Sequence, residues 1–368
     1  MESLLHDVES RRELDLKSKD HLLGFGECFS SRLVTEALCH SGIDAAHVDA
    51  RACIITDARH GQATPVRDAT EHRLQETVGA LLTRGKVPVL GGFIASTSDG
   101  VPTTLGRGGS DFSAAIVGAA LCAARVEIWT DVDGVMTTDP KLCSEARVIR
   151  KMSFEEASEM AHLGAKVLHP ATLAPAMREN IPVYVLNSRA PEGEGTEIVA
   201  RAKSGSVVSA ITAKRNVAAV EIQSGHAIDS EFLRAVYAAF DRHVCPVDVM
   251  ATSLGRMSLL VGSTASLPAI AADLRGVADV RWENHQALVC LVGENIRRHP
   301  GVASQVFAAV ADMDVRVVCQ GASDRNISFL VQESKVEESV RRLHGVFFPP
   351  AERAHDWGGL SSAFCQAG

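Results

Sequence analysis

A glycine-rich stretch that runs directly into an apolar helical segment constrains the fold more than any other feature. Residues 103–111 read TTLGRGGSD, and an apolar run from Phe112 to Ala124 follows at once. A glycine loop at a helix N-terminus gathers backbone N–H donors and the positive end of the helix dipole, which suits an anion such as phosphate. Arg107 adds a planar cation that matches a carboxylate or a phosphate. On spacing alone, an ordinary flexible loop is an equally good interpretation.

Length and composition narrow the class of protein. A chain of 368 residues, 46% of them hydrophobic, is long enough for two or more domains with buried cores. The net charge of -8 and the scattered basic residues do not indicate a nucleic-acid partner. The nine cysteines form no C-x-x-C pair and no Cys/His cluster at zinc spacing, which predicts reduced thiols, a cytoplasmic location and no metal site. The charged N-terminus is not a signal peptide, and no apolar run is long enough to span a bilayer.

The first half of the chain alternates predicted strands and helices, the rhythm of a parallel α/β sheet. An exposed helix over 1–23 and a second helix over 28–39, with Phe29, Leu33 and Val34 at helical spacing, are expected to flank a glycine turn at 24–27. The further expected strands cover 51–57, 87–93, 126–130 and 181–187, and the further helices cover 68–84, 112–124, 153–164 and 171–179. Ligands bind beyond the carboxyl ends of such strands, where Gly91, Gly92, Thr130, Asp131 and the glycine loop would lie.

Three aspartates crowd the turn region after the 126–130 strand. Carboxylates at strand ends hold Mg²⁺ or bind a nucleotide, whereas Asp-Gly and Asp-Pro pairs are turn signals. Asp133 and Asp139 precede Gly134 and Pro140 and are interpreted as turn residues, and Asp131 as a ligand-binding residue. Further on, Ser153 and Glu156 have the spacing of a capping box at a helix start.

The C-terminal part contains an internal repeat. Residues 236–240 align with 306–310, and the segments around them predict two small β-α-β-β units. Asp248 in the first copy aligns with Val318 in the second, and a charge whose counterpart is apolar needs a partner, such as an amino-acid ammonium group. With Asp229 and Ser230 at a nearby loop–helix junction, this predicts a small-molecule effector site in the first copy.

Three motifs together resemble the aspartate kinase (aspartokinase) family. They are TTLGRGGSD at 103–111, WTDVDG at 129–134 and GAKVLHP at 164–170, and the tandem repeat is similar to that family's paired ACT domains. The likeness is greatest to the monofunctional, lysine-sensitive type. It implies an α/β amino-acid kinase fold, an αβα sandwich with a mainly parallel sheet, over residues 1–200. Two ACT domains of βαββαβ type would follow at 207–283 and 284–348, and a tail or linker at 349–368.

The resemblance also implies an activity and its residues. The reaction would be ATP plus L-aspartate to ADP and 4-phospho-L-aspartate, with Mg²⁺ bound to the nucleotide, at the start of lysine, threonine and methionine synthesis. Lysine inhibition and a homodimer or higher homo-oligomer formed through the ACT domains are expected. The implied substrate-binding residues are Glu27 (ammonium), Arg107 (carboxylate), Gly108, Gly109 and Ser110, with Arg107 and Asp111 catalytic. The implied nucleotide-binding residues are Thr130, Asp131, Met136, Lys141, Lys166 and Val167, and the effector-binding residues are Asp229, Ser230, Phe232, Leu233 and Asp248.

The chain departs from the family pattern at several positions. Met136, Lys141 and Asp229 stand where Tyr, Arg and a small polar residue are usual, and the family's Lys-Phe-Gly-Gly motif does not occur. Loss of such a phosphate-neutralising lysine typically costs on the order of 10²–10³ in rate. Two interpretations follow: an aspartate kinase sequence cut short, or a non-catalytic amino-acid-binding regulatory subunit or inactive fragment. A kinase for glutamate, acetylglutamate or a nucleotide is a third, which the 107–111 loop and the ACT-like repeat argue against.

Overall fold

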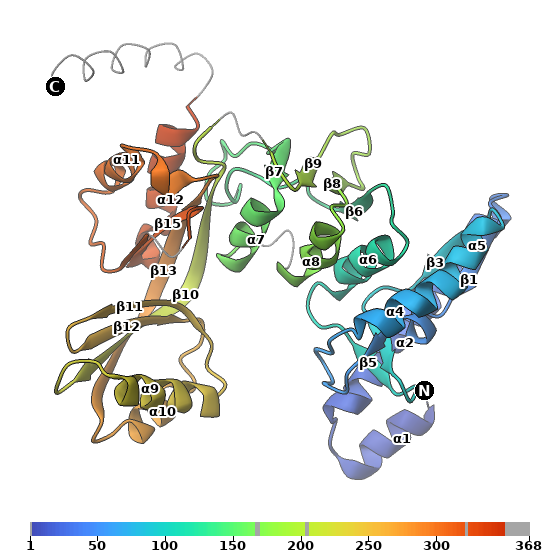
Figure 1. The fold of residues 1–368 in the computed structure, drawn as a ribbon, viewed down its shortest axis with the longest axis horizontal. Coiled ribbons are helices and arrows are strands. Elements are labelled where there is room, and N and C mark those ends of the chain that lie inside the picture. The colour runs from blue at the N-terminus through green and yellow to red at the C-terminus, as the bar shows by residue number, and fades with distance from the viewer. Residues whose placement is uncertain (1, 166–169, 203–205, 321–322, 350–368) are drawn as a thin grey trace. The chain divides into compact units, whose positions relative to one another are not determined.

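The computed structural model describes residues 2–165, 170–202, 206–320 and 323–349, which fall into two compact units. The first unit comprises 1–135, 150–161 and 166–203, and the second comprises 136–149, 162–165 and 204–368. Figure 1 shows the elements of both along the chain. In the described residues, no helix has both the length and the hydropathy needed to cross a membrane.

The first unit is an α/β structure, as predicted. Its helices are α1 (Glu2–Arg11), α2 (Leu16–His40), α3 (Ala50–Cys53), α4 (Arg67–Leu74), α5 (Ala80–Thr83), α6 (Gly109–Ala120), α7 (Phe154–His162) and α8 (Pro170–Arg178), and a π-helical turn, η1 (Gln75–Gly79), joins α4 to α5. Its strands are β1 (Ala45–Val48), β2 (Ile55–Thr56), β3 (Val87–Leu90), β4 (Ile94–Thr97), β5 (Pro102–Thr104), β6 (Val126–Thr130), β7 (Lys151–Ser153), β8 (Val183–Asn187) and β9 (Thr196–Val199).

These strands form three small sheets rather than one. β1 pairs with β3, β2 pairs with β4, which also pairs with β5, and the third sheet has the order β6-β8-β9-β7. Most of these pairs are parallel, but β4–β5 and β8–β9 are antiparallel. β4 and β5 are antiparallel because a tight turn joins them: Thr97 N–H donates to Val101 O at 2.9 Å, and Gly100 takes a φ of +78°.

Two local predictions for this unit are wrong. The segment 51–57 is not one strand, because Asp49 caps a short helix by accepting a hydrogen bond from Arg51 N at 3.1 Å, and the paired strand is limited to Ile55–Thr56. Residues 24–27 do not form a turn but lie inside the continuous helix α2. By contrast, the capping box at α7 is confirmed, since Ser153 N–H and Oγ both donate to Glu156 Oε2 at 2.9 Å.

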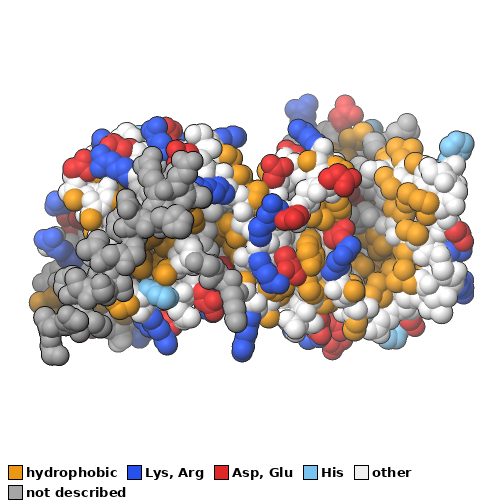
Figure 2. All heavy atoms as spheres, turned by 90° about the horizontal axis from the view of Figure 1, so that it is seen from above, with side chains coloured by type: hydrophobic (Ala, Val, Ile, Leu, Met, Phe, Trp, Pro, Cys, Tyr) orange, Lys and Arg blue, Asp and Glu red, His pale blue; other side chains and the backbone are white. Residues whose placement is uncertain are grey.

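The apolar residues at helical spacing on α2 are exposed rather than buried. Phe29, Leu33 and Val34 are 58%, 70% and 50% exposed, whereas Ser31 and Thr35 are buried. Their hydroxyls donate to backbone carbonyls one turn earlier at 2.7 Å, so these polar groups are satisfied within the helix and can be buried. Figure 2 shows hydrophobic side chains gathered at the surface of the first unit.

The second unit contains the predicted repeat. Its elements are β10 (Ala210–Ser224), α9 (Ser230–Arg242), β11 (Val247–Ser253), β12 (Arg256–Val261), α10 (Leu267–Asp273), β13 (Ala278–Val292), η2 (Ile296–Arg298), α11 (Val302–Ala309), β14 (Val318–Gln320), β15 (Asn326–Gln332), η3 (Glu333–Lys335) and α12 (Val336–Phe347). These strands join in one sheet of order β11-β12-β10-β13-β15-β14. α9 and α11 occupy the two aligned helical segments, so each copy has its own helix beside its own strands.

The long strands β10 and β13 run through both copies of the repeat. Residues 219–224 of β10 pair with 278–283 of β13, and residues 210–214 pair with 288–292. Two apolar cores result, one around Phe232 and Leu259 and the other around Val289 and Phe329. Val208 and Ile211 pack in the second of these cores, so the start of β10, which the sequence places with the first copy, belongs by its contacts to the second.

Candidate functional site

The predicted substrate residues from α2 and from the glycine loop converge on Gly91 and Gly92, just past the end of β3. A Cβ on Gly91 would lie 3.0 Å from the Glu27 carbonyl oxygen and 3.3 Å from Glu27 Cβ. A Cβ on Gly92 would lie only 2.9 Å from Ser110 Cα. A Cβ on Gly92 would thus collide with the backbone of α6, and one on Gly91 would be crowded by Glu27. The missing side chains allow Glu27 and Ser110, distant in sequence, to approach one strand end.

The glycine loop has a defined conformation rather than that of a free linker. Gly106 and Gly108 take φ values of +76° and +71°, and Gly108 is the N-cap of α6. A Cβ on Gly109 would lie 2.8 Å from the Phe93 ring. Phe93 N–H donates to Ser113 Oγ at 2.9 Å, which ties the strand-end segment to the first turn of α6. The structure thus gives the loop the form of a helix N-terminal anion site.

The charged groups of this region differ in their exposure. Arg107 is exposed, which leaves its guanidinium group accessible to an anion in solution. Asp111 lies half-buried in the first turn of α6, and burial raises the pKa of its carboxyl group. The loop and the start of α6 therefore carry an accessible cation, Arg107, and an acidic group, Asp111, whose charged form is disfavoured by burial.

A buried carboxylate that the sequence did not single out supports this loop. Asp20 on α2 accepts hydrogen bonds from Thr104 Oγ1 at 2.6 Å and from Gly61 N at 2.9 Å. The Gly61 carbonyl oxygen in turn lies 3.1 Å from where a Cβ on Gly106 would be. A lone aspartate in a polar helix gives no signal in the sequence, because its partners come from segments far along the chain.

The three aspartates that follow β6, Asp131, Asp133 and Asp139, differ in their hydrogen bonds. Asp139 accepts a hydrogen bond from Lys141 N at 2.9 Å, as a turn residue does, whereas Asp133 accepts one from Asn187 Nδ2, at the end of β8, at 2.6 Å. Asp131 remains exposed directly after the strand, with Thr130 Oγ1 donating to it at 3.4 Å. Its carboxylate oxygens are therefore accessible to a ligand or a hydrated cation.

The other residues expected at the nucleotide lie elsewhere in the chain or outside the described residues. Met136 and Lys141 belong to the second compact unit, on the segment 136–149. Met136 forms a β-bridge with Val148, and Lys141 is exposed. Lys166 and Val167 lie outside the described residues.

The predicted effector residues lie in the first turn of α9 and on the strand β11. Asp229 is the N-cap of α9 and accepts from Phe232 N at 2.8 Å, while the Phe232 side chain is buried in the core of the first copy. Ser230 is exposed and Leu233 is partly buried. Asp248 has the partner that its position demands, because Lys214 Nζ on β10 lies 2.6 Å from its Oδ2. The sequence did not predict this lysine.

Sequence comparisons place the chain among known proteins. The amino acid kinase family model matches residues 2–187, and an ACT domain model matches residues 289–347. Lysine-sensitive aspartokinase 3 of Escherichia coli (strain K12) is 37% identical over 338 residues, covering 89% of this chain and 75% of that protein. Chloroplastic aspartokinase 3 of Arabidopsis thaliana is 34% identical over 363 residues, covering 95% of this chain and 65% of that protein. The chain thus spans about two thirds to three quarters of their length.

Solved structures of E. coli aspartokinase III have the same fold. The complex with aspartate and ADP (R-state) superposes with a TM-score of 0.83 at 35% identity, covering 94% of this chain and 80% of that one. The complex with lysine and aspartate (T-state) has a TM-score of 0.77 at the same identity and coverage. Of these two complexes, the R-state one agrees better.

Proposed function

The chain belongs to the aspartokinase family, and on this premise we propose that it transfers the γ-phosphoryl group of ATP to the side-chain carboxylate of L-aspartate. The products are ADP and 4-phospho-L-aspartate. Support comes from the E. coli relative, which was solved with aspartate and ADP. MgATP enters this reaction as a substrate, with the cation neutralising its phosphate charge.

The observation that carries the proposal is the approach of Glu27 and Ser110 to Gly91 and Gly92. The aspartate carboxylate is already ionised at neutral pH, so the reaction needs no strong general base. Its barrier comes from bringing two anions together, which makes orientation and charge neutralisation the main tasks of the protein. Glu27 binds the ammonium group of aspartate, and Arg107 holds a carboxylate through its planar guanidinium group.

The start of α6 supplies the remaining electrostatic contribution. The first N–H groups of a helix lack intrahelical partners and point towards an anion at its N-terminus. Gly108, Gly109 and Ser110 hold the substrate there, and Asp111 contributes a half-buried carboxyl group beside the reacting groups. The proposed nucleotide contacts are Thr130 and Asp131 at the end of β6, with Met136, Lys141, Lys166 and Val167.

We further propose that lysine regulates the enzyme through the first copy of the repeat. The proposed contacts are Asp229, Ser230, Phe232, Leu233 and Asp248, and the E. coli relative was solved with lysine. Because Phe232 is buried, its contribution is through its backbone. A homodimer formed through the ACT sheet and a cytoplasmic location complete the proposal, the latter supported by the free cysteines.

Trapping of aspartyl phosphate by hydroxylamine tests the activity. The purified chain is incubated with MgATP and either aspartate or glutamate, and formation of the hydroxamate is measured. Arg107→Ala is expected to lower kcat/KM for aspartate by about 10²–10³, as loss of one charge-stabilising donor does. Glu27→Gln is expected to raise the KM for aspartate, whereas Glu36→Gln, an exposed position on the same helix, leaves it unchanged.

Two outcomes would contradict this proposal. A preference for glutamate over aspartate would point to a different amino-acid kinase. Lysine binding without any aspartate-dependent turnover would instead support a regulatory, amino-acid-binding role.

A further inference from the structure

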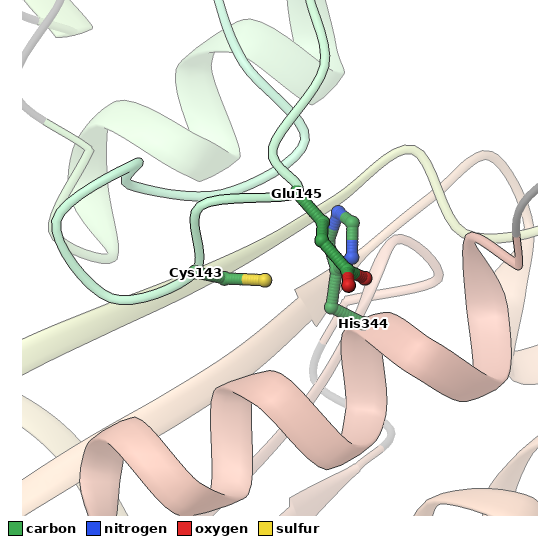
Figure 3. A group of neighbouring side chains, drawn as sticks. All are labelled: Cys143, Glu145 and His344. Atoms are coloured by element: carbon green, nitrogen blue, oxygen red, sulfur yellow. The ribbon is translucent and has the colours of Figure 1, made fainter.

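Three side chains with metal-binding chemistry meet in the second unit, whereas the proposed catalytic residues Arg107 and Asp111 belong to the first unit. Cys143 and Glu145 come from the segment 136–149, and His344 comes from α12 (Figure 3). One potential ligand atom from each lies within 4.8 Å of those of the other two. Cys143 and His344 are 5% and 0% exposed, while Glu145 lies at the surface.

The His344 ring has one nitrogen with a partner and one without. Its Nε2 lies 3.0 Å from Thr137 Oγ1, which also accepts a hydrogen bond from Arg147 N at 3.0 Å. Its Nδ1 is buried and makes no hydrogen bond to any part of the chain that the structure describes. An unpaired buried polar atom typically costs about 1–3 kcal/mol. A cation at Nδ1 removes that cost, and it leaves Nε2–H to donate to Thr137.

The backbone around the two other ligands is held by its own hydrogen bonds. Cys143 N–H donates to Asp139 O at 3.1 Å, and Ala146 N–H donates to Cys143 O at 3.2 Å, so a turn brings Glu145 back towards Cys143. The base of the segment is tied to β10 because Ile211 N–H donates to Thr137 O at 2.7 Å. The three ligands therefore come from ordered backbone rather than from a free loop.

We propose that Cys143, Glu145 and His344 form a binding site for Zn²⁺, with water in the fourth position. Thiolate, imidazole and carboxylate are the ligands that zinc takes, whereas Mg²⁺ and Ca²⁺ prefer oxygen alone. Zinc bonds of about 2.0–2.3 Å place tetrahedral ligand atoms roughly 3.3–3.8 Å apart, so ligand atoms that lie within 4.8 Å of one another need to approach by no more than about 1.5 Å. The exposed side chain of Glu145 is free to make that movement.

The charges at the site are close to balanced when it is filled. On binding, the Cys143 thiol releases its proton to solvent, so thiolate and carboxylate together offset the two charges of the metal. Arg147 is the nearby positive charge that opposes a cation, and its guanidinium group donates to the carbonyl oxygens of Phe348 and Pro349.

Zinc at this site links the segment 136–149 to α12. That segment also carries Met136 and Lys141, so metal binding would restrain two of the proposed nucleotide contacts. This consequence rests on the proposed function, whereas the metal site itself does not. Zinc would then act as an inhibitor or modulator through the nucleotide KM.

The test uses the full chain with Zn²⁺ and Co²⁺ as probes, without ATP or aspartate. We expect one tightly bound zinc per chain and, with Co²⁺, an absorption band from thiolate-to-metal charge transfer. Glu145→Gln changes an exposed side chain and is expected to weaken zinc binding by about tenfold or more, because loss of even an outer-shell partner costs that much. Cys143→Ser is expected to abolish the cobalt band, whereas Cys245→Ser, in the other core of the unit, leaves it intact.

The absence of a charge-transfer band in the wild-type chain would overturn the proposal. So would a band that survives Cys143→Ser, or zinc affinity unchanged by Glu145→Gln, since either would place the metal elsewhere. Because these titrations require no turnover, a failed metal site and a failed kinase assignment are distinguishable.

Discussion

The hydroxyl group of Thr104 donates a hydrogen bond to the carboxylate of Asp20 at 2.6 Å, joining α2 to the end of β5. Asp20 is 1% exposed and also accepts from Gly61 N and pairs with His60 Nδ1, both at 2.9 Å. Gly61 packs against Gly106 in the glycine loop. One buried carboxylate therefore holds both the strand that leads into the loop and the turn that lies against it.

Removal of this carboxylate is expected to destabilise the first unit strongly. Asp20→Ala leaves the buried donors of Thr104 and Gly61 without an acceptor, and hydrogen bonds to a charged group contribute about 1.5–3 kcal/mol each. We expect the free energy of unfolding to fall by about 3 kcal/mol, measured as a lower urea midpoint at an unchanged slope. Glu36→Ala, exposed on the same helix, is the control, with an expected change within about 0.5 kcal/mol. Equal midpoints for the two variants would contradict the role given to Asp20.

Local sequence patterns predict the structure correctly where the interactions lie within one segment. The capping box at Ser153 and the helix that follows the glycine loop both appear as predicted, because their hydrogen bonds join residues a few positions apart. They were misleading for α2, where apolar spacing predicts a buried face around Phe29 and Leu33. The structure buries Ser31 and Thr35 instead, since the hydrogen bonds of their hydroxyls to the preceding turn offset the cost of removing them from water.

Spacing rules do not predict which residues make contact when they are far apart in the sequence. The internal repeat predicts two units in sequence, yet β10 and β13 each serve both cores, because a 15-residue strand can pair along its whole length with different partners. In the same way, the sequence gives no sign of the cluster of Cys143, Glu145 and His344, since Cys143 and His344 are separated by most of the second unit. Only the fold brings their side chains together.

The close approach at Gly92 predicts a strong effect of a single methyl group. Gly92→Ala puts a Cβ at 2.9 Å from Ser110 Cα, a backbone atom of α6 that cannot move aside. We expect a loss of about 1–3 kcal/mol in the free energy of unfolding, together with a higher KM for aspartate.

Gly26→Ala provides the matched control for Gly92→Ala. Gly26 lies in the interior of α2, and a Cβ added there would have no neighbouring atom within 4 Å, so this substitution is expected to stabilise the chain by about 0.5–1 kcal/mol. Thermal unfolding measures the change in stability of both variants, and hydroxamate kinetics measures their KM for aspartate. An unchanged KM in the Gly92 variant would argue that Ser110 does not contact the substrate.

The burial of Asp111 predicts a pH-dependent contribution to stability. Because burial raises its pKa in the folded state, the carboxyl group stabilises the fold below the unfolded pKa of about 3.9, and this contribution is lost as pH rises through the folded value. Asp111→Asn removes that dependence. The variant is expected to be more stable than the wild type at pH 7, with a difference that shrinks as the pH falls to about 4. Urea midpoints at the two pH values test this expectation, and an advantage that grows in acid would show instead that the α6 dipole lowers the pKa.

The pairing of Lys214 with Asp248 makes a prediction about the effector, because the ammonium group of Lys214 repels a second cation at the same carboxylate. If effector lysine binds Asp248, the side chain of Lys214 competes with it. Asp248→Asn is therefore expected to weaken lysine binding by about tenfold or more, the effect of losing one charged hydrogen bond. Lys214→Met keeps the length of the side chain but removes its charge, and it is expected to tighten lysine binding by a similar factor.

Lys335→Met, which breaks an exposed lysine–glutamate pair in the second copy, is the control and should leave binding unchanged. Isothermal titration with lysine measures all three, and weaker binding in the Lys214 variant would mean that this residue positions Asp248 for the effector rather than competing with it.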